Sequence, residues 1–490
     1  MTSQRLQELF AHFDRKRVVV VGDVYLDEVV RGLMTGVSLE SPVPIVEIAE
    51  RLYNPGAAGN AACNVAALGA KTTMVGVVGA DSNAGILHAE FARFGVDASG
   101  LVVDPAHPTN TYGKLSAHSA HSVPQEVLRT DTPTPPPISG DVERNVIRAI
   151  DKVAEKADAI VVVDQVGSVA SAGVLACVAE IGRRRKILTV GDSRGRINRF
   201  KGFGVAVPND GELGQAFGLD TSTPAGLAKA AQQLLGVLDA GLITCGERGI
   251  AGFSKAGSFT RAAMAPRVVD VTGAGDTVTA AVTLALLSGA TLEESAYVGN
   301  AAAAVAVGQS GVVTVSREEV LRLAEGGNPS GKVVPLGDLR RVLDGLRRTG
   351  KRIVWTNGCF DIIHAGHVLY LERAAREGDV LVVGLNSDAS VRALKGPERP
   401  IVPQDERALI MSAFSAVGFV TVFDEVSPLG AIDTLRPDIY VKGGDYTVDM
   451  INQDERRLVE GYGGRIAIIA GVEGRSTTNI VRRLAEEYRE

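Results

Sequence analysis

Short runs of β-branched residues alternate with alanine-rich helical patterns along much of this chain, and this alternation constrains the fold more than any other feature. Runs of strand length occur at residues 17–21, 160–163, 187–190, 204–207 and 241–244. Helical patterns lie between many of them, at residues 58–68, 142–154, 171–181 and 224–235. Apolar strands that alternate with helices form βαβ units around a parallel sheet. The sequence therefore predicts an α/β protein.

A segment of turn-forming residues interrupts this pattern. Residues 326–331 read Gly-Gly-Asn-Pro-Ser-Gly, which favours a loop. A new helical pattern begins at residue 337, and further strand-like runs follow at residues 352–356, 380–385, 419–423, 439–441 and 466–469. We therefore expect a first domain at residues 1–324, a linker at 325–337 and a second domain at 338–490.

Charge, cysteine usage and hydropathy exclude several classes of protein. The formal net charge of −6 argues against a surface that binds nucleic acid. The four cysteines lie far apart and form no C-x-x-C pair, which favours a reduced compartment, so we expect a cytoplasmic protein. The longest apolar stretch, at residues 300–308, is mostly alanine, which predicts a buried helix and no membrane span.

A glycine-rich segment in the first domain has the features of an anion site. Residues 270–277 read Asp-Val-Thr-Gly-Ala-Gly-Asp-Thr, and an alanine-rich helical pattern follows at 278–287. The glycines allow a turn whose N–H groups face an anion, and the helix adds the positive end of its dipole. Asp276, at the helix start, can accept a proton from a hydroxyl during phosphoryl transfer. Taken alone, the segment is also typical of a capped helix after a tight turn.

Polar residues follow other strand-like runs of this domain, where open α/β sheets bind ligands. The first run ends in Gly-Asp-Val-Tyr-Leu-Asp at residues 22–27, with two carboxylates suited to sugar hydroxyls. Residues 55–60 open a helix with small residues and an amide, and residues 208–212 carry an N-x-x-E pattern. The segment 244–249 follows another strand.

Together these segments resemble the ribokinase-like (PfkB) family of carbohydrate kinases over nearly the whole first domain, and the order of N-x-x-E and G-A-G-D is specific to that family. The resemblance implies a three-layer α/β/α domain with a small β lid. It implies that Asp276 is the catalytic base and that Asn209 and Glu212 organise Mg²⁺ indirectly. Gly273, Ala274 and Gly275 would form the anion hole. The ATP site would contain Thr244, Gly246 and Asn300. The sugar site would contain Asp23, Gly56 and Asn60.

Two histidines mark a second site, where residues 356–367 run from a strand into a helix. His364 and His367 are three residues apart, hence on one face of the helix start, and Gly366 between them allows a phosphate to approach. Two imidazoles there can donate hydrogen bonds to a pentavalent phosphorus in the transition state. A zinc site is the weaker interpretation, because it needs three or four protein ligands and no further His or Cys pair lies nearby. A pair of core histidines is weaker still.

This part of the chain resembles the cytidylyltransferase-like family of H-x-G-H nucleotidyltransferases over essentially all of the second domain. The resemblance implies a Rossmann-like α/β domain that transfers a nucleoside monophosphate and releases pyrophosphate. It implies that His364, His367 and Lys395 stabilise charge at the α-phosphate. The residues implied to bind the nucleotide are Gly358, Phe360, Asp361, Ser476 and Thr477, and those implied to bind the sugar phosphate are Lys442 and Asp445.

The two domains in one chain resemble the family of bifunctional heptose 7-phosphate kinases and heptose 1-phosphate adenylyltransferases. The resemblance implies phosphorylation of D-glycero-β-D-manno-heptose 7-phosphate at C1, followed by adenylyl transfer to heptose 1-phosphate, which yields ADP-heptose for lipopolysaccharide. It implies ATP and Mg²⁺ as cofactors, and it leaves open a monovalent cation as a further cofactor. The partners would be small-molecule sugar phosphates and ATP. A partly exposed strand predicted at residues 42–53 belongs to the lid, from which we expect a homodimer.

The first domain also departs from that family's pattern. The basic run expected near residues 112–121 is replaced by Tyr-Gly-Lys-Leu-Ser-Ala-His-Ser-Ala-His, and the segment 163–167 lacks the family's lysine. We expect Lys114, Arg129 and Arg194 to bind the distal sugar phosphate instead. His118 and His121 are a metal pair or, as we favour, part of a solvated loop. Three alternatives stay open: a non-catalytic binding and dimerisation module in place of the kinase, a different sugar phosphate, and CTP as the nucleotide donor.

Overall fold

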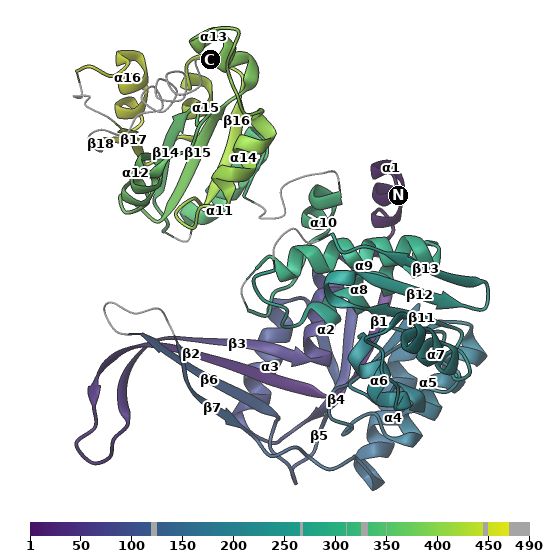
Figure 1. Ribbon diagram of the computed structural model, residues 1–490. Helices are drawn as coiled ribbons and strands as arrows, with labels where there is room; N and C mark the ends of the chain where they lie inside the picture. The colour runs from purple at the N-terminus through teal and green to yellow at the C-terminus, as the bar shows by residue number, and fades with distance from the viewer. Residues whose placement is uncertain are drawn as a thin grey trace. The chain divides into compact units, whose positions relative to one another are not determined.

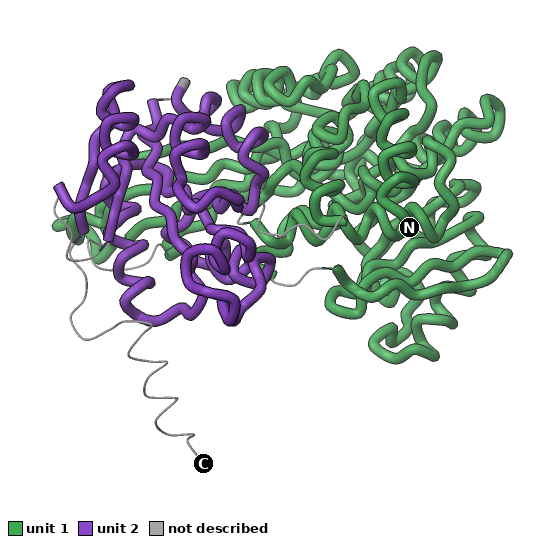
Figure 2. Tube along the Cα trace, turned by 90° about the horizontal axis from the view of Figure 1, so that it is seen from above, with its two compact units in different colours: residues 1–325 green, residues 326–490 purple. Residues whose placement is uncertain are grey.

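The computed structural model describes residues 1–118, 125–264, 268–309, 311–324, 332–348, 350–443 and 449–469. It divides into two compact units, residues 1–325 and 326–490 (Figure 2). Each unit has its own sheet and its own hydrophobic cores, so each is described by itself.

A nine-stranded sheet forms the centre of the first unit (Figure 1). Its strands, from edge to edge, are β13 (Gly257–Arg261), β12 (Ile250–Ser254), β11 (Ala240–Thr244), β10 (Val205–Ala206), β9 (Leu188–Ser193), β8 (Ala159–Asp164), β1 (Arg17–Gly22), β4 (Lys71–Val78) and β5 (Val96–Val103). The strands from β11 to β5 pair in parallel, whereas β12 and β13 are antiparallel additions at one edge. The predicted parallel sheet is therefore confirmed.

Helices cover both faces of this sheet, because successive residues of each strand point to opposite sides. In β1, Val18 and Val20 belong to one buried cluster, and Val19 and Val21 belong to another. The first cluster includes helices α1 (Ser3–Phe10), α2 (Ala58–Ala67), α3 (Ser82–Arg93), α8 (Ala274–Leu287), α9 (Leu292–Val307) and α10 (Arg317–Ala324). The second includes α4 (Gly140–Ala154), α5 (Ala172–Arg185), α6 (Asp210–Phe217) and α7 (Pro224–Leu234). The result is the predicted three-layer α/β/α domain.

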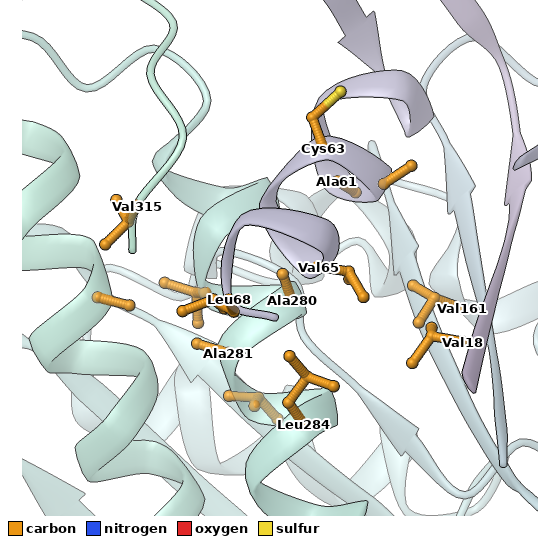
Figure 3. Packing of buried hydrophobic residues seen from close by; sticks show 14 of the residues in the cluster. Val18, Ala61, Cys63, Val65, Leu68, Val161, Ala280, Ala281, Leu284 and Val315 are labelled. Carbon is orange, nitrogen blue, oxygen red and sulfur yellow. The ribbon is translucent and has the colours of Figure 1, made fainter. Parts of the chain in front are cut away.

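Helix α2 is packed between the sheet and α8 by small apolar side chains (Figure 3). Val65 of α2 lies on the side of β1 and β8, near Val18 and Val161, and Ala280 and Ala281 of α8 lie on the other side. Small side chains let the two helices approach closely. This packing holds the start of α8 beside α2.

A separate four-stranded sheet projects from the sandwich (Figure 1). Its strands, in order, are β3 (Pro44–Ala57), β2 (Val24–Val37), β6 (Thr111–His118) and β7 (Gln125–Asp131). β2 follows β1 almost directly, and the long β2–β3 hairpin extends beyond the part that β6 covers. This sheet has the position of the predicted lid, and β3 contains most of the strand predicted at residues 42–53.

A five-stranded parallel sheet forms the centre of the second unit. Its order is β16 (Phe419–Phe423), β15 (Val380–Asn386), β14 (Ile353–Gly358), β17 (Ile439–Gly443) and β18 (Arg465–Ile469). In the described part of this unit the helices are α11 (Leu336–Arg348), α12 (Ala365–Ala375), α13 (Asp388–Lys395), α14 (Gln404–Ser412), α15 (Leu429–Leu435) and α16 (Gln453–Gly461). Successive residues of β14 belong to cores on opposite faces of the sheet: Val354 to one core, and Ile353 and Trp355 to the other. The strand order reverses at β14, where open α/β sheets place their ligand crevice.

Short 3-10 turns complete the described elements, at Phe13–Arg15, Ile197–Arg199 and Gly246–Arg248. Within the described ranges, none of the helices combines the length and the apolar composition that a membrane crossing requires.

Candidate active sites

A cavity of about 1490 Å³ lies between the lid sheet and the carboxyl ends of strands β8 to β11. Its lining includes the residues after each of these strands and the beginning of α8. It brings together residues that the sequence analysis singled out in separate segments, namely Gly56, Asn60, Lys114, Arg129, Arg194, Asn209, Glu212, Thr244, Gly246, Gly273, Ala274, Gly275, Asp276 and Asn300.

Asp276 lies in the first turn of α8, whose N-cap is Gly273. One oxygen of Asp276 accepts a hydrogen bond of 2.7 Å from the side-chain amide of Asn60. Burial raises the pKa of the Asp276 carboxyl to about 7, with added repulsion from Asp27 and Glu212. A carboxylate with such a pKa is suited to accept a proton near neutral pH.

Gly273 is the residue that this turn requires. Its φ of 77° lies in the left-handed region. A Cβ atom there would come within 2.7 Å of the Asn60 amide nitrogen. The glycine therefore permits both the backbone turn and the close approach of Asn60.

Asp23, which is predicted to hold the sugar, is bonded to protein groups in the structure. Asp23 is 1% exposed and is not among the residues that line the cavity. Its carboxylate accepts backbone hydrogen bonds from Gln165, Val166 and Val169, at 2.8 to 3.0 Å. It therefore fastens the loop after β8 to the end of β1, and both of its oxygens accept from that loop.

Asp27, the second carboxylate of the same segment, faces the cavity instead. Gly56 on β3 packs against it, since a Cβ atom at Gly56 would lie 2.7 Å from an Asp27 carboxylate oxygen. Burial raises the pKa of Asp27 to about 6, and the charges of Lys114 and Arg129 oppose that shift. Asp27 is therefore the carboxylate of this segment that lines the cavity, a position that the sequence analysis quoted without choosing it.

The N-x-x-E pair forms a capping box at the start of α6. The Asn209 side chain accepts from the Glu212 N–H at 2.8 Å, and the Glu212 carboxylate accepts from the Asn209 N–H at 2.9 Å. Burial raises the pKa of Glu212. Both residues line the cavity, so the box fixes the position of an acidic group at its wall.

Sequence reasoning missed Asp192, which also lines this cavity. It accepts a hydrogen bond of 3.0 Å from the Thr279 hydroxyl of α8. Burial raises its pKa well above the usual range, and the charges of Glu212 and Asp276 act in the same direction. A carboxylate at the end of the strand-like run 187–190 was the signal that could have identified it.

The lid supplies the basic side of the cavity. Lys114 of β6 and Arg129 of β7 are cross-strand partners. Arg129 pairs with Asp131 at 2.9 Å and lies over the ring of Tyr112, with 5.1 Å from its guanidinium carbon to the ring centroid. His118 ends β6, whereas His121 lies outside the described residues.

Two further residues at the edge of the cavity bond other protein groups: Asn300, and Asp164 in the segment 163–167 that lacks the family's lysine. The Asn300 side chain donates to the Ala262 carbonyl at 2.6 Å and accepts from the Met264 N–H. Asp164, in the segment that lacks the lysine, forms an ion pair with Arg196 at 3.0 Å. Arg196 therefore provides the cation beside that carboxylate.

In the second unit, His364 is the N-cap of α12 and His367 follows in the first turn. The Nδ1 atom of His364 accepts from the Gly366 N–H at 3.1 Å, and the Nδ1 atom of His367 accepts from the His364 N–H at 3.4 Å. The two ring centroids are 4.0 Å apart. Because both Nδ1 atoms are acceptors, each neutral ring carries its proton on Nε2 and can donate from there.

The surroundings keep His367 neutral. Burial, with the charges of His364 and Lys395, lowers its pKa to about 4. Phe360, which has a positive φ of 44°, packs edge-on against its ring at 5.5 Å. Lys395 ends α13. Neutral donors beside a lysine suit an anionic phosphate.

Asp361, which is predicted to bind the nucleotide, is bonded to protein groups in the structure. It is 4% exposed, and its oxygens accept from Arg399 and from the N–H groups of Ile401 and Val402. It therefore holds the loop after α13 against the end of β14. Gly358, the last residue of β14, packs against the ring of Phe360.

Lys442 at the end of β17 is also held by protein groups. Its ammonium lies 3.3 Å from Glu455 and 3.4 Å from the side-chain oxygen of Asn357. The remaining predicted residues of this site, Asp445, Ser476 and Thr477, lie outside the described residues.

Comparison with known proteins agrees with this division of sites. The protein-family model described as pfkB family carbohydrate kinase matches residues 15–125 and 139–319 of this chain. The protein-family model described as cytidylyltransferase-like matches residues 355–483. The curated protein "Bifunctional protein HldE" of Geobacter sulfurreducens is 38% identical over 496 residues, covering 100% of both chains. The protein of the same name from Geotalea uraniireducens is 39% identical over 490 residues, covering 99% of each. This chain belongs to the bifunctional HldE family.

Membership of the HldE family makes the chain an enzyme with a carbohydrate kinase domain followed by a nucleotidyltransferase domain. Among solved structures, phosphofructokinase-2 from Escherichia coli covers 64% of this chain and 98% of its own length, with a TM-score of 0.53 and 19% identity. That likeness shows the ribokinase-like fold of the first unit. The comparisons therefore confirm the two predicted families and their order along the chain.

Proposed function

We propose that the first unit transfers a phosphoryl group from ATP to C1 of D-glycero-β-D-manno-heptose 7-phosphate, and that the second unit joins heptose 1-phosphate to AMP from ATP, giving ADP-heptose and pyrophosphate. The observation that carries this proposal is the full-length match to bifunctional HldE proteins, together with one cavity and one histidine pair that suit these reactions. The sugar itself rests on the family resemblance.

In the kinase reaction, Asp276 takes the proton of the anomeric hydroxyl as that oxygen attacks the γ-phosphorus. The N–H groups of the turn 273–275 and the start of α8 stabilise negative charge on the transferred group. In our proposal Asp27 and Asn60, which line the cavity, bind the sugar hydroxyls. The side chains of Lys114, Arg129 and Arg194 carry the charge that a distal sugar phosphate needs.

The carboxylates of Asp192 and Glu212 fit Mg²⁺, because this ion prefers oxygen ligands and is usually bound through one or two carboxylates together with substrate phosphates. When bound, Mg²⁺ would neutralise charge on the ATP phosphates. Asn209 keeps Glu212 at the cavity wall through the capping box.

In the adenylyl transfer, the Nε2–H groups of His364 and His367 and the ammonium of Lys395 stabilise the charge that develops on the α-phosphate. A covalent nucleophile is unnecessary, because the attacking sugar phosphate is already an anion. Both reactions use soluble small molecules, so we place the enzyme in the cytoplasm.

We also propose a homodimer formed through the lid. The β2–β3 hairpin carries apolar side chains that are exposed in the single chain, among them Val37 at 64% and Ile45 at 47%. Such a surface is typical of a protein contact. Light scattering of the purified chain measures the mass directly.

Two substitutions test the two-site proposal. Asp276→Asn should abolish sugar phosphorylation and leave adenylyl transfer intact, and His364→Ala should have the opposite effect. Phosphorus NMR of the purified chain with heptose 7-phosphate and ATP, and separately with heptose 1-phosphate and ATP, follows both products. Loss of both activities from either folded variant would refute two independent sites. Binding of heptose 7-phosphate without turnover in the unmodified chain would favour a non-catalytic first unit.

A further inference from the structure

We propose that Asn64, a buried amide that is not part of the cavity lining, fixes the orientation of the Asn60 amide and through it positions the Asp276 carboxylate. The inference rests on the proposed kinase function, since Asp276 is the base of that reaction. It makes Asn64 a positioning residue of the first active site.

The contact between Asn60 and Asp276 depends on which end of the Asn60 amide points toward the carboxylate. The NH₂ end is a donor and lies 2.7 Å from an Asp276 oxygen. The opposite end is an acceptor of nearly the same shape. If the amide turned over, its oxygen would face the carboxylate and the two would repel each other. A further contact must therefore select the observed orientation.

Asn64 supplies that contact from one helical turn further along α2. Its NH₂ group donates to the Asn60 side-chain oxygen and to the Asn60 carbonyl, both at 3.1 Å. One hydrogen of this NH₂ group is paired with the backbone carbonyl, and the other is paired only when the Asn60 side-chain oxygen faces it. The NH₂ end of Asn60 is then directed to Asp276.

The orientation of Asn64 is itself determined by a group that cannot reverse its role. Its side-chain oxygen accepts from the backbone N–H of Val315 at 3.3 Å, and it also lies 3.2 Å from the hydroxyl of Thr277, which is shared with the Gly273 carbonyl. A backbone N–H can only donate. The direction of hydrogen bonding is therefore set from Val315 through Asn64 and Asn60 to Asp276.

Burial favours this one arrangement of hydrogen bonds over its alternatives. Asn64 is 0% exposed, so water offers it no alternative partner, and Asn60, at the cavity wall, is only 3% exposed. An unpaired polar group at such a position is costly, which favours the fully paired arrangement. The small side chains between α2 and α8 also leave the two helices little freedom to shift (Figure 3).

Loss of the hydrogen bond from Asn64 to the Asn60 side chain should change the pKa of Asp276. Without a directed donor from Asn60, the charged form of Asp276 loses stabilisation, so its pKa should rise. The other charged groups around Asp276 are not altered by a substitution at Asn64; they are Asp27, Asp192, Arg194 and Glu212.

The experiment is a double-substitution cycle on the full chain, with Asn64→Leu, Asn60→Leu and both together. Asn64→Leu should lower kcat of the kinase about tenfold at pH 7 and move the acidic limb of the kcat profile to higher pH, with KM for the sugar phosphate changed less than about threefold. In the Asn60→Leu background, Asn64→Leu should have no further effect on kcat. An unmoved acidic limb, or independent effects that multiply, would overturn the inference.

Thr283→Val is the matched control, because Thr283 is fully buried in α8 and its hydroxyl bonds the Thr279 carbonyl. It should lower stability without moving the acidic limb. If Asn64→Leu does not fold, Asn64→Ser keeps an acceptor for Val315 and replaces it in the cycle. If the unmodified chain phosphorylates no sugar, the proposed function fails. The inference is then tested by carbon-13 NMR titration of Asp276, assigned with Asp276→Asn, where an identical pKa with and without Asn64 would overturn it.

Discussion

Arg407 of the second unit should be essential for the stability of that unit. Its side chain is 0% exposed. The guanidinium donates to the carbonyls of Val402, Cys359 and Asn386, at 2.5 to 2.9 Å, and to the carboxylate of Asp388 at 2.6 Å. It therefore joins the loop that precedes α12, the end of β15 and the loop that precedes α14.

The magnitude follows from the groups that Arg407→Met would leave behind. Removal of one partner of a buried ion pair costs about 3–5 kcal/mol. The lower part of that range applies to Asp388, because its side chain is 27% exposed and water can solvate it. Each carbonyl that stays buried without a donor adds about 1–3 kcal/mol. We therefore expect the free energy of unfolding of the second unit to fall by at least about 3 kcal/mol.

The single tryptophan of the chain makes the assay specific. Trp355 lies fully buried in β14, so its fluorescence during urea unfolding reports the second unit. Arg341→Met is the matched control, because Arg341 is 80% exposed and pairs with Asp338 across one helical turn. It should change the free energy of unfolding by less than about 0.5 kcal/mol. A loss below about 1 kcal/mol for Arg407→Met, with an unchanged urea dependence, would refute the reasoning.

Two further predictions concern pH. The pKa of Asp276 is raised to about 7, and the base must be deprotonated to act. We therefore expect kcat of the kinase to fall with decreasing pH below about 7 and to level off above it. A profile that is flat from about pH 5.5 to 8 would exclude Asp276 as the base. Because the pKa of His367 is lowered to about 4, this ring stays neutral across the same range, so adenylyl transfer should show no inflection from it. An inflection near pH 6.5 that disappears in His367→Gln would contradict this.

Local patterns were sufficient to predict the two α/β units, and many of the residues singled out in the first unit line one cavity. The carboxyl ends of parallel strands meet at one sheet edge, so polar residues after different strands converge without knowledge of the packing. This is why Asn209 and Thr244, which follow β10 and end β11, line one cavity. The spacing of His364 and His367 likewise predicted their shared position at the start of α12.

Which polar groups are free to meet a ligand could not be predicted in this way. Asp23 and Asp27 lie in the same short segment, yet Asp23 is occupied by N–H groups of residues 165–169 and Asp27 faces the cavity. Asp361 is occupied in the same manner by the loop at residues 399–402. These partners lie tens to more than a hundred residues away in the chain, so no local pattern contains them.

The sequence by itself therefore determined the two folds, their order and the chemistry of their motifs, because strand and helix periodicity and turn residues act over a few neighbours. Only the tertiary structure decided which carboxylate faces the cavity, and how Asn60 is turned toward Asp276. Those outcomes depend on hydrogen bonds between distant segments. In a buried site each donor and acceptor must be paired, so the distant partner determines the role of the local residue.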